Sequence, residues 1–230
     1  MKKEENYESL EDRVYNSVDP FQEISHQTYK DLLKERTILI NGEIKENIIE
    51  RVVMQITRMS REHPATPIYI VLNSYGGSTF DAQAVVDTMR ASKTPIITKV
   101  LGKAMSAAFD IFLAGDLRVV LENSVLMCHC GAQDLENIKL SDSLDEAKFT
   151  AELFKRWSQY YASRTKLSEK EWLNMLKSGK DRYFFPEECI TLEIAHQVEA
   201  YIDKKLTPKT PKAKKRRKVK SKKKSRKTAK

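Results

Sequence analysis

Two kinds of apolar pattern alternate along the chain. Continuous apolar runs such as 67–72 are typical of buried strands, and apolar residues spaced three or four positions apart predict helices with one apolar face. We expect strands at residues 37–40, 67–72, 95–101, 118–121 and 125–129. We expect helices at residues 46–61, 79–91, 106–114, 144–164, 168–177 and 186–196.

Local signals mark the ends of several of these elements. Asn41-Gly42 is a turn dipeptide after the first strand, and Gly102 is expected to end the third. Ser168 with Glu171 three residues later forms the pattern of a capping box. Pro186 suits the first position of a helix.

The alternation of strands and helices predicts an α/β fold, in which βαβ units surround a mainly parallel sheet. Residues 1–28 are polar and lack a sustained period, so we expect a flexible or partly helical arm there. The folded domain is expected to occupy residues 29–203. Residues 204–230 are rich in Lys and Arg and of low complexity, which predicts a disordered tail.

The formal net charge of +9 combines two parts of opposite sign. Of the 41 basic residues, 16 lie between Lys204 and Lys230, where no acidic residue occurs. In residues 1–203 the remaining basic residues are outnumbered by all 32 acidic ones, so the body of the chain is acidic. The tail can attract nucleic acid or another polyanion through salt-sensitive contacts, or it can simply be solvated.

The three cysteines are too few, and odd in number, for a disulfide framework, and they suit a reducing compartment. Cys128-His129-Cys130 is not expected to bind a metal, because neighbours in a strand point to opposite faces and no second cluster completes a site. The charged N-terminus lacks the apolar segment of a signal peptide, and no run of about 18 apolar residues occurs. We therefore expect a cytoplasmic protein without a membrane span.

Two of the expected strands end in small-residue turns that open a helix, at residues 70–78 and 99–108. Turns of this kind present backbone N–H groups at the N-terminus of a helix, where they can bind an anion. Two such turns side by side can form an oxyanion hole. Ser106 lies in the second turn among small alanines, where it can be a nucleophile or an ordinary helix N-cap.

A serine nucleophile needs a base and a carboxylate that orients the base. Of the four histidines, His129 is the best candidate because it ends an apolar strand and can project from the edge of the sheet, although a histidine there can also be structural. Asp110, four residues after Ser106 in an apolar helix, needs a partner if it points into the interior. We keep Asp110 as a reserve candidate for a functional carboxylate.

Six short motifs follow one another along the chain. They are Leu32-Leu-Lys-Glu-Arg-Thr-Ile-Leu, Asn73-Ser-x-Gly-Gly-Ser78, Asp87-Thr-Met89, Gly102-x-Ala-x-Ser106, Asn123-Ser…Met127-x-His129 and Asp181-Arg-Tyr-Phe…Glu188. Each motif is weak by itself. In their order and spacing they resemble the Clp protease proteolytic subunit, a serine peptidase, over about residues 28–203.

The resemblance implies a role for each matching position. Ser106 matches the nucleophile, His129 the general base and Asp181 the carboxylate that orients the base. The backbone N–H groups of Gly77 and Ala107 match the oxyanion-hole donors. From the residues alone, Asp181 would be a solvated carboxylate in a charged loop.

The resemblance also implies how the substrate, a polypeptide, is bound and delivered. An extended substrate adds a strand beyond the Gly-Gly turn, at about Ser78–Phe80, with Gly76, Ser78 and Thr79 as candidate binding residues. The fold is a spiral of βαβ units, and the helix at 144–164 is a protruding handle between two stacked heptameric rings. A hexameric AAA+ unfoldase supplies ATP hydrolysis, and neither a metal nor a cofactor is expected.

The chain departs from the family pattern near the expected site. Tyr75 stands where the family usually has Pro, Ala108 where it has Gly, and Asp110 where it has an apolar residue. Gly179-Lys180 replaces an acidic-Arg pair that couples rings to activity. These changes affect substrate preference and ring contacts, but none removes Ser106, His129 or Asp181.

Three other functions remain open at the level of sequence. The chain can be a catalytically inactive ring subunit beside an active partner. It can be an acyl-CoA enzyme, because the crotonase fold shares the spiral layout. It can also be a nucleic-acid-binding protein in which the basic tail binds and the folded body is a scaffold.

Overall fold

The computed structural model of the protein describes residues 20–130 and 140–200. Most of the predicted N-terminal arm, and the whole of the predicted basic tail, lie outside these residues. Helix α2 (Pro20–Lys34) begins within the segment predicted as an arm and leads to the first strand. The domain limits at residues 29 and 203 stay predictions.

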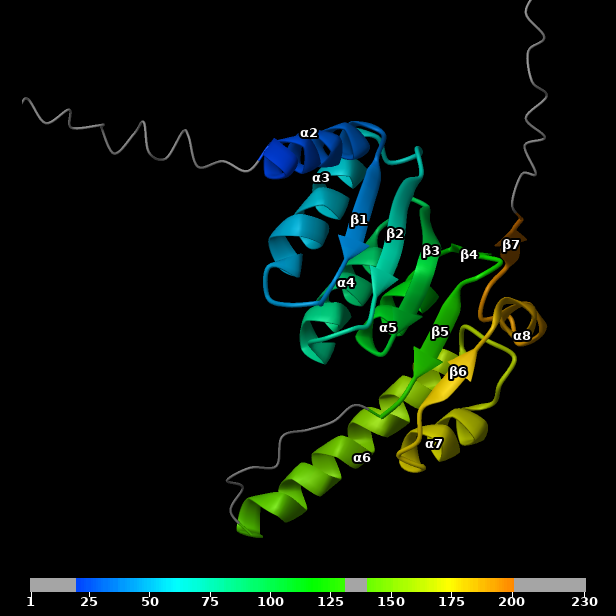
Figure 1. Ribbon diagram of the computed structural model, residues 1–230. Helices are drawn as coiled ribbons and strands as arrows, with labels where there is room; N and C mark the ends of the chain where they lie inside the picture. Colours follow the sequence, from blue (N-terminus) through cyan, green and yellow to red (C-terminus); the bar gives the residue numbers. More distant parts are fainter. Residues whose placement is uncertain (1–19, 131–139, 201–230) are drawn as a thin grey trace, which may run out of the picture.

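Seven strands form one sheet with the main order β1-β2-β3-β4-β7, and neighbours along this path are parallel (Figure 1). Strand β5 pairs with β3 in parallel, and β6 pairs with β5 in antiparallel. This mainly parallel sheet confirms the predicted α/β class. The strand bounds are β1 Thr37–Asn41, β2 Ile68–Ser74, β3 Ile96–Met105, β4 Leu117–Leu121, β5 Val125–Cys128, β6 Arg182–Phe184 and β7 Gln197–Glu199.

Strand β3 changes neighbours along its length. Residues 97–100 pair with β4, whereas residues 103–105 pair with β5. Between these two segments Gly102 has φ +83°, a conformation that glycine adopts without steric cost, and it bends the strand from one partner to the other. The prediction that Gly102 ends this strand is therefore wrong, and β3 continues to Met105.

The helices connect the strands and follow the predicted spacing in most places. Helix α4 matches the prediction at both ends, and Ser168 forms the expected capping box at the start of α7. The helix predicted over 186–196 is shorter and ends at Thr191, and Glu193 just after it has φ 56°, which does not continue a right-handed helix. The bounds are η1 (a π-helical turn) Ile49–Val53, α3 Met54–Glu62, α4 Thr79–Ala91, α5 Ala107–Ala114, α6 Leu140–Ala162, α7 Glu169–Lys177 and α8 Pro186–Thr191.

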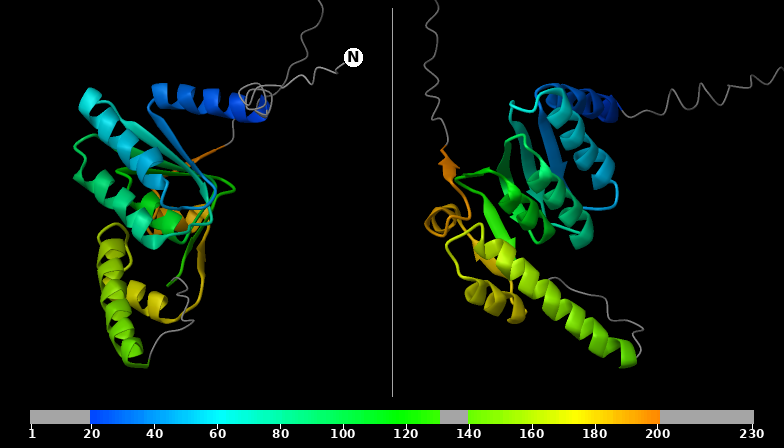
Figure 2. Two further views of the ribbon diagram at one scale, coloured as in Figure 1. Left: turned by 90° about the vertical axis from the view of Figure 1, so that its left-hand side faces the viewer. Right: turned by 180° about the vertical axis from the view of Figure 1, so that it is seen from behind.

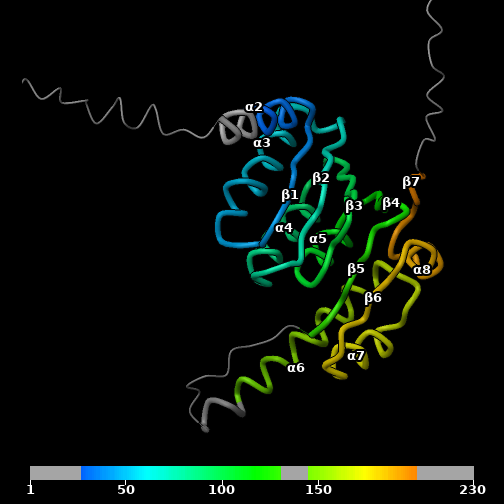
Figure 3. The backbone as a smooth tube through the Cα atoms, in the orientation of Figure 1, coloured from blue at the N-terminus to red at the C-terminus, as the bar shows by residue number. Residues whose placement is uncertain are grey.

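Alternate residues of β2 are buried, so one face of the strand is covered, whereas its continuous apolar run predicted a strand buried on both faces. Helices α3, α4 and α5 lie together on this face (Figure 2). Helix α6 extends away from the sheet as a protruding rod, as the backbone trace makes clear (Figure 3). Within residues 20–130 and 140–200, none of the helices has the length and apolar character needed to cross a membrane.

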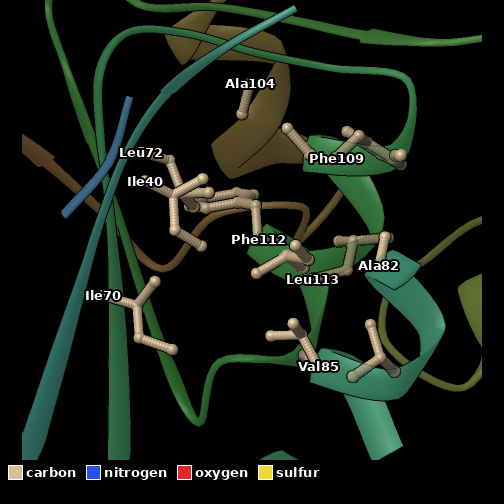
Figure 4. Close-up of a cluster of buried hydrophobic side chains, with 14 of the residues drawn as sticks. Ile40, Ile70, Leu72, Ala82, Val85, Ala104, Phe109, Phe112 and Leu113 are labelled. Carbon is tan, nitrogen blue, oxygen red and sulfur yellow. The ribbon is translucent and has the colours of Figure 1, made fainter. Parts of the chain in front are cut away.

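The main core lies between the sheet and helices α4 and α5. All eight residues of α5 are buried, so this helix is part of the interior rather than a surface helix. Side chains from the strands and from both helices meet in this layer (Figure 4). The labelled members are Ile40, Ile70, Leu72, Ala82, Val85, Ala104, Phe109, Phe112 and Leu113.

An aromatic cluster joins α5 to the C-terminal third of the domain. The ring of Phe109 lies 5.8 Å from Tyr161 on α6, 6.1 Å from Trp172 on α7 and 5.8 Å from Phe184 on β6, measured between centroids. Aromatic pairs at these distances contribute beyond their buried area. Phe109 therefore fixes α6, α7 and β6 against the helix that follows Ser106.

We expect Phe109→Ala to lower the free energy of unfolding by about 3–5 kcal/mol, because it removes a fully buried ring and leaves a cavity. Phe80→Ala is the matched control, since 64% of Phe80 is exposed, and it should change stability by about 0.5 kcal/mol or less. Urea unfolding followed by tryptophan fluorescence measures both. Equal losses for the two variants would contradict the central role of Phe109.

Candidate active site

Ser106 occupies the sharp connection between β3 and α5. Its backbone has φ 53° and ψ −129°, a strained conformation for a residue with a side chain. Its amide donates to the carbonyl of Met127 at 2.9 Å, which anchors the turn to β5. Ser106 stands at the N-cap position, but its hydroxyl makes no capping hydrogen bond. The interpretation of Ser106 as an ordinary helix cap is therefore wrong.

The register of β3 and β5 brings His129 to Ser106. Met105 is paired with Met127, so the residues that follow each strand emerge side by side. The Nε2 atom of His129 lies 2.7 Å from the Oγ atom of Ser106. This distance suits a hydrogen bond in which the hydroxyl donates to an unprotonated ring nitrogen.

The short strand β6 brings Asp181 to the other side of His129. Cys128 is paired with Arg182 in antiparallel, so the next step of the ladder sets His129 opposite Asp181. The Nδ1 atom of His129 lies 3.3 Å from Oδ1 of Asp181. A proton on Nδ1 that points to this carboxylate leaves Nε2 free to accept from Ser106. The three side chains that the resemblance selected thus form a contiguous chain of contacts.

Gly76 provides the space for close contact between the two turns. A Cβ atom at Gly76 would lie 2.6 Å from the carbonyl oxygen of Met105, 2.7 Å from Cβ of Ser106 and 3.0 Å from the amide nitrogen of Ala107. Only a residue without a side chain fits here, and its φ of +102° also favours glycine. The backbone of the first turn therefore lies directly against Ser106.

The backbone of Gly77 is oriented by pairing with Ile44. Ile44 donates to the carbonyl of Gly76 and accepts from the amide of Ser78, both at 2.9 Å. In such a parallel bridge the N–H group of the middle residue points to the opposite edge. Within residues 20–130 and 140–200, neither the amide of Gly77 nor that of Ala107 has a hydrogen-bond acceptor. Two donors are thus left in the two turns that meet at Gly76 and Ser106.

The predicted substrate-binding segment needs a correction. Gly77 forms an isolated parallel bridge with Ile44, but Thr79 and Phe80 already belong to α4, so they cannot add to a β-ladder. The hydroxyl of Ser78 instead accepts from the amide of Asp81 at 3.4 Å and caps the helix. Thr79 still lines a small hollow of about 20 Å³ together with Ser106 and His129.

Asp110 is buried, with 4% of its surface exposed, and it has partners as the sequence requires. Its Oδ1 atom accepts from the hydroxyl of Tyr161 at 2.5 Å, and its Oδ2 atom accepts from Gln83 at 3.3 Å. Burial raises the pKa of Asp110 to about 7, while these two hydrogen bonds act in the opposite direction. Asp181, and not Asp110, contacts His129 among the described residues.

Sequence reasoning missed Tyr161 and Gln83 as the partners of Asp110. Both lie on other helices, and no local pattern links them to α5. The available signal was the carboxyl group inside an apolar helix, which required hydrogen-bond donors from elsewhere. Two adjacent tyrosines in the sequence of α6 were suitable candidates.

The other departures do not disturb the contacts of Ser106. Tyr75 is 71% exposed, and its ring centroid lies 4.2 Å from Nζ of Lys103. Ala108 is fully buried within α5. In the described part of the chain, no group of three or more His, Cys, Asp and Glu residues is arranged to bind a metal.

Comparisons with known proteins show the family to which the chain belongs. The model of the family described as Clp protease matches residues 21–201. The ATP-dependent Clp protease proteolytic subunit of Deinococcus radiodurans is 29% identical to this chain over 178 residues. That alignment covers 76% of this chain and 86% of the relative.

We expect Gly76→Ala to destabilise the protein more than Gly42→Ala. Both positions have positive φ, but a Cβ atom at Gly42 would have no atom within 4 Å, whereas one at Gly76 would collide with Met105 and Ser106. Backbone strain alone should cost about 1 kcal/mol, and crowding should add about 1–3 kcal/mol at Gly76. Denaturant unfolding of the two variants measures the difference. Equal losses would show that crowding at Gly76 is relieved without cost.

The buried Asp110 should make stability depend on pH. Because its folded-state pKa of about 7 exceeds its ordinary value of 3.8, the folded state retains a proton that the unfolded state releases. The stability that Asp110 contributes is therefore full below about pH 4 and is lost as pH rises to about 7. Burial keeps the pKa values of Tyr161 and Cys128 well above this range, so these neighbours do not titrate there.

Asp110→Asn cannot titrate, so its stability relative to wild type should rise between about pH 4 and pH 7 and then level off. Urea unfolding at one-unit pH intervals measures this difference. A difference that stays constant across the range would show that Asp110 does not bind its proton more tightly in the folded state.

Proposed function

Because the chain belongs to the Clp protease family, we propose that it is a serine endopeptidase with Ser106, His129 and Asp181 as its catalytic triad. The observation that carries this proposal is the 2.7 Å contact between the Ser106 hydroxyl and His129. The strained backbone of Ser106 and its absent capping bond also suit a nucleophile held at a strand-to-helix turn.

The proposed reaction proceeds in two acyl-transfer steps. His129 takes the proton of Ser106 as its oxygen attacks the peptide carbonyl, and the resulting imidazolium gives that proton to the leaving amine. A water molecule then attacks the acyl-enzyme and transfers its proton to His129, which returns it to Ser106. Asp181 fixes the ring tautomer and stabilises the positive charge that forms on His129.

The amides of Gly77 and Ala107 are the proposed donors for the oxyanion. Ala107 directly follows Ser106 and Gly77 directly follows Gly76, and the close approach of Gly76 to Ser106 and Ala107 keeps the two turns together. Preorganised donors of this kind stabilise charge that develops in the transition state. The segment Gly76–Ser78, in which Gly77 is bridged to Ile44, is the proposed edge along which a polypeptide substrate lies.

We further propose that the protein works as a ring of subunits fed by an AAA+ unfoldase. The relative from Deinococcus radiodurans carries the name of an ATP-dependent proteolytic subunit, which supports this extension. Helix α6 projects from the domain and carries the half-exposed Phe149, so it suits a contact between subunits. A double ring of heptamers is the proposed assembly, and the cytoplasm is the proposed location.

The basic tail is proposed as a separate binding element for nucleic acid or another polyanion. Its support is the concentration of 16 basic residues without any acidic residue between Lys204 and Lys230. The three alternatives for the whole chain, an inactive ring subunit, an acyl-CoA enzyme and a nucleic-acid-binding scaffold, are not favoured by the match to the protease family.

A fluorophosphonate probe, which reacts with activated serines, tests the triad. Wild-type protein should be labelled at Ser106, and Ser106→Ala should not be labelled. His129→Gln and Asp181→Asn should slow labelling by roughly 10²–10⁴-fold, because each removes part of the activation of the nucleophile. Intact-protein mass spectrometry follows the adduct over time.

Ser163→Ala provides the control, since Ser163 is exposed and donates to a carbonyl within the same helix end. It should be labelled at the wild-type rate. Native mass spectrometry of the same sample tests the ring through a mass of seven or fourteen copies of the 26.6 kDa chain. Labelling that persists in Ser106→Ala would rule out Ser106 as the nucleophile, and turnover of a thioester but not of a peptide would favour the acyl-CoA alternative.

A further inference from the structure

Three helices meet at Asp110. Its carboxyl oxygens accept hydrogen bonds from Gln83 on α4 and Tyr161 on α6, and its backbone carbonyl accepts from Tyr160 on α6 at 3.2 Å. Asp110 itself lies on α5. One residue therefore links α5 to the helix on each side through directional contacts.

These contacts lie immediately beneath the candidate active site. Asp110 is one helical turn beyond Ser106, and it lines the same small hollow as Ser106 and His129. The same helix begins with Ala107, whose amide is a proposed oxyanion donor. A shift or rotation of α5 would therefore move the nucleophile and this donor together, away from His129.

The carboxyl group is not needed simply to fill the interior. The sequence of α5 is AAFDIFLA, in which Asp110 is the one ionisable residue. An apolar side chain of similar size would avoid the loss of hydration that a buried carboxyl group suffers. Such a side chain would leave the hydroxyl of Tyr161 and the amide of Gln83 without their acceptor, and it would not define the position of α5 by hydrogen bonds.

We propose that Asp110 is a positioning residue, whose hydrogen bonds to Gln83 and Tyr161 hold α5 so that Ser106 and the Ala107 amide stay aligned with His129. Asp110 acts through the helix. Among the described residues its carboxyl group accepts from Gln83 and Tyr161, and not from the side chain of Ser106 or His129. This role rests on the proposed peptidase function. Displacements of about 1 Å can slow an enzyme by about 100-fold, so small changes in the position of α5 suffice.

Two substitutions at Asp110 separate its hydrogen bonds from its charge. Asp110→Asn keeps an oxygen for Tyr161, and its amide nitrogen can donate to Gln83 once the Gln83 carboxamide rotates. Asp110→Leu loses both contacts. We expect Asp110→Asn to react with the fluorophosphonate within about 3-fold of the wild-type rate, and Asp110→Leu to react about 10- to 100-fold more slowly.

Tyr161→Phe is an independent variant, because it removes the 2.5 Å contact from the opposite side and leaves the carboxyl group in place. It should also slow labelling by about 10-fold or more. With a fluorogenic peptide, both slow variants should lower kcat while KM changes little. The measurements are made well below the unfolding temperature, with the folded fraction verified by circular dichroism.

Ile56→Ala is the control for stability, since Ile56 is buried on α3, away from Asp110. It should lower the unfolding temperature without slowing the labelling of folded protein. Slow labelling in Asp110→Leu and Tyr161→Phe, with Asp110→Asn near wild type, supports the proposal. If Asp110→Leu and Tyr161→Phe label as fast as Ile56→Ala, Asp110 is structural and the proposal is overturned.

If Asp110→Asn is as slow as Asp110→Leu, the charge rather than the hydrogen bonds matters, and the positioning role is again overturned. Should Asp110→Leu fail to fold, Tyr161→Phe and Asp110→Asn still decide between these outcomes. Wild-type protein that is not labelled at Ser106 would instead overturn the peptidase function itself, which is a distinct result because it precedes any comparison of variants.

Discussion

The bend of β3 at Gly102 is the constraint on which the rest of the site depends. Before the bend the strand is held by β2 and β4, and after it by β2 and β5. The change of neighbour places the end of β3 beside the end of β5, so Ser106 and His129 emerge together. The antiparallel pairing of β6 with β5 then adds Asp181. The contacts of the three side chains thus follow from two strand registers rather than from any local loop conformation.

Close packing of backbone against backbone is the second requirement. The turn at Gly76 and the turn at Ser106 can approach only because Gly76 has no side chain, and Gly77 meets Ile44 under the same restriction. Pairing with Ile44 uses the polar groups of Gly76 and Ser78 and leaves the Gly77 amide on the other edge. An N–H group that donates to a transient negative charge benefits from such a fixed orientation, because the donor does not have to reorient when the charge develops.

The sequence predicted what local chemistry determines. Helix α4 was correctly placed by the spacing of its apolar residues and α7 by the capping box at Ser168, and the parallel sheet followed from the alternation of elements. The shift of β3 at Gly102 was missed, since glycine ends a strand as readily as it bends one. Asp181 had no local signal, because its position depends on a three-residue strand that pairs across the fold. For Ser106, local pattern favoured a cap, and only the resemblance to a family indicated the nucleophile.

The two carboxyl groups near His129 show how environment separates their roles. Asp181 is half exposed, contacts the imidazole and also accepts from the hydroxyl of Tyr183 at 3.3 Å. Its contact with Nδ1 can orient the imidazole ring. Asp110 is buried, and its pKa of about 7 means that its charge is only partly developed near neutral pH. A group in that state is poorly suited to stabilise a cation, and both of its oxygens already accept from fixed donors. The geometry agrees, since its partners are Tyr161 and Gln83 and not His129.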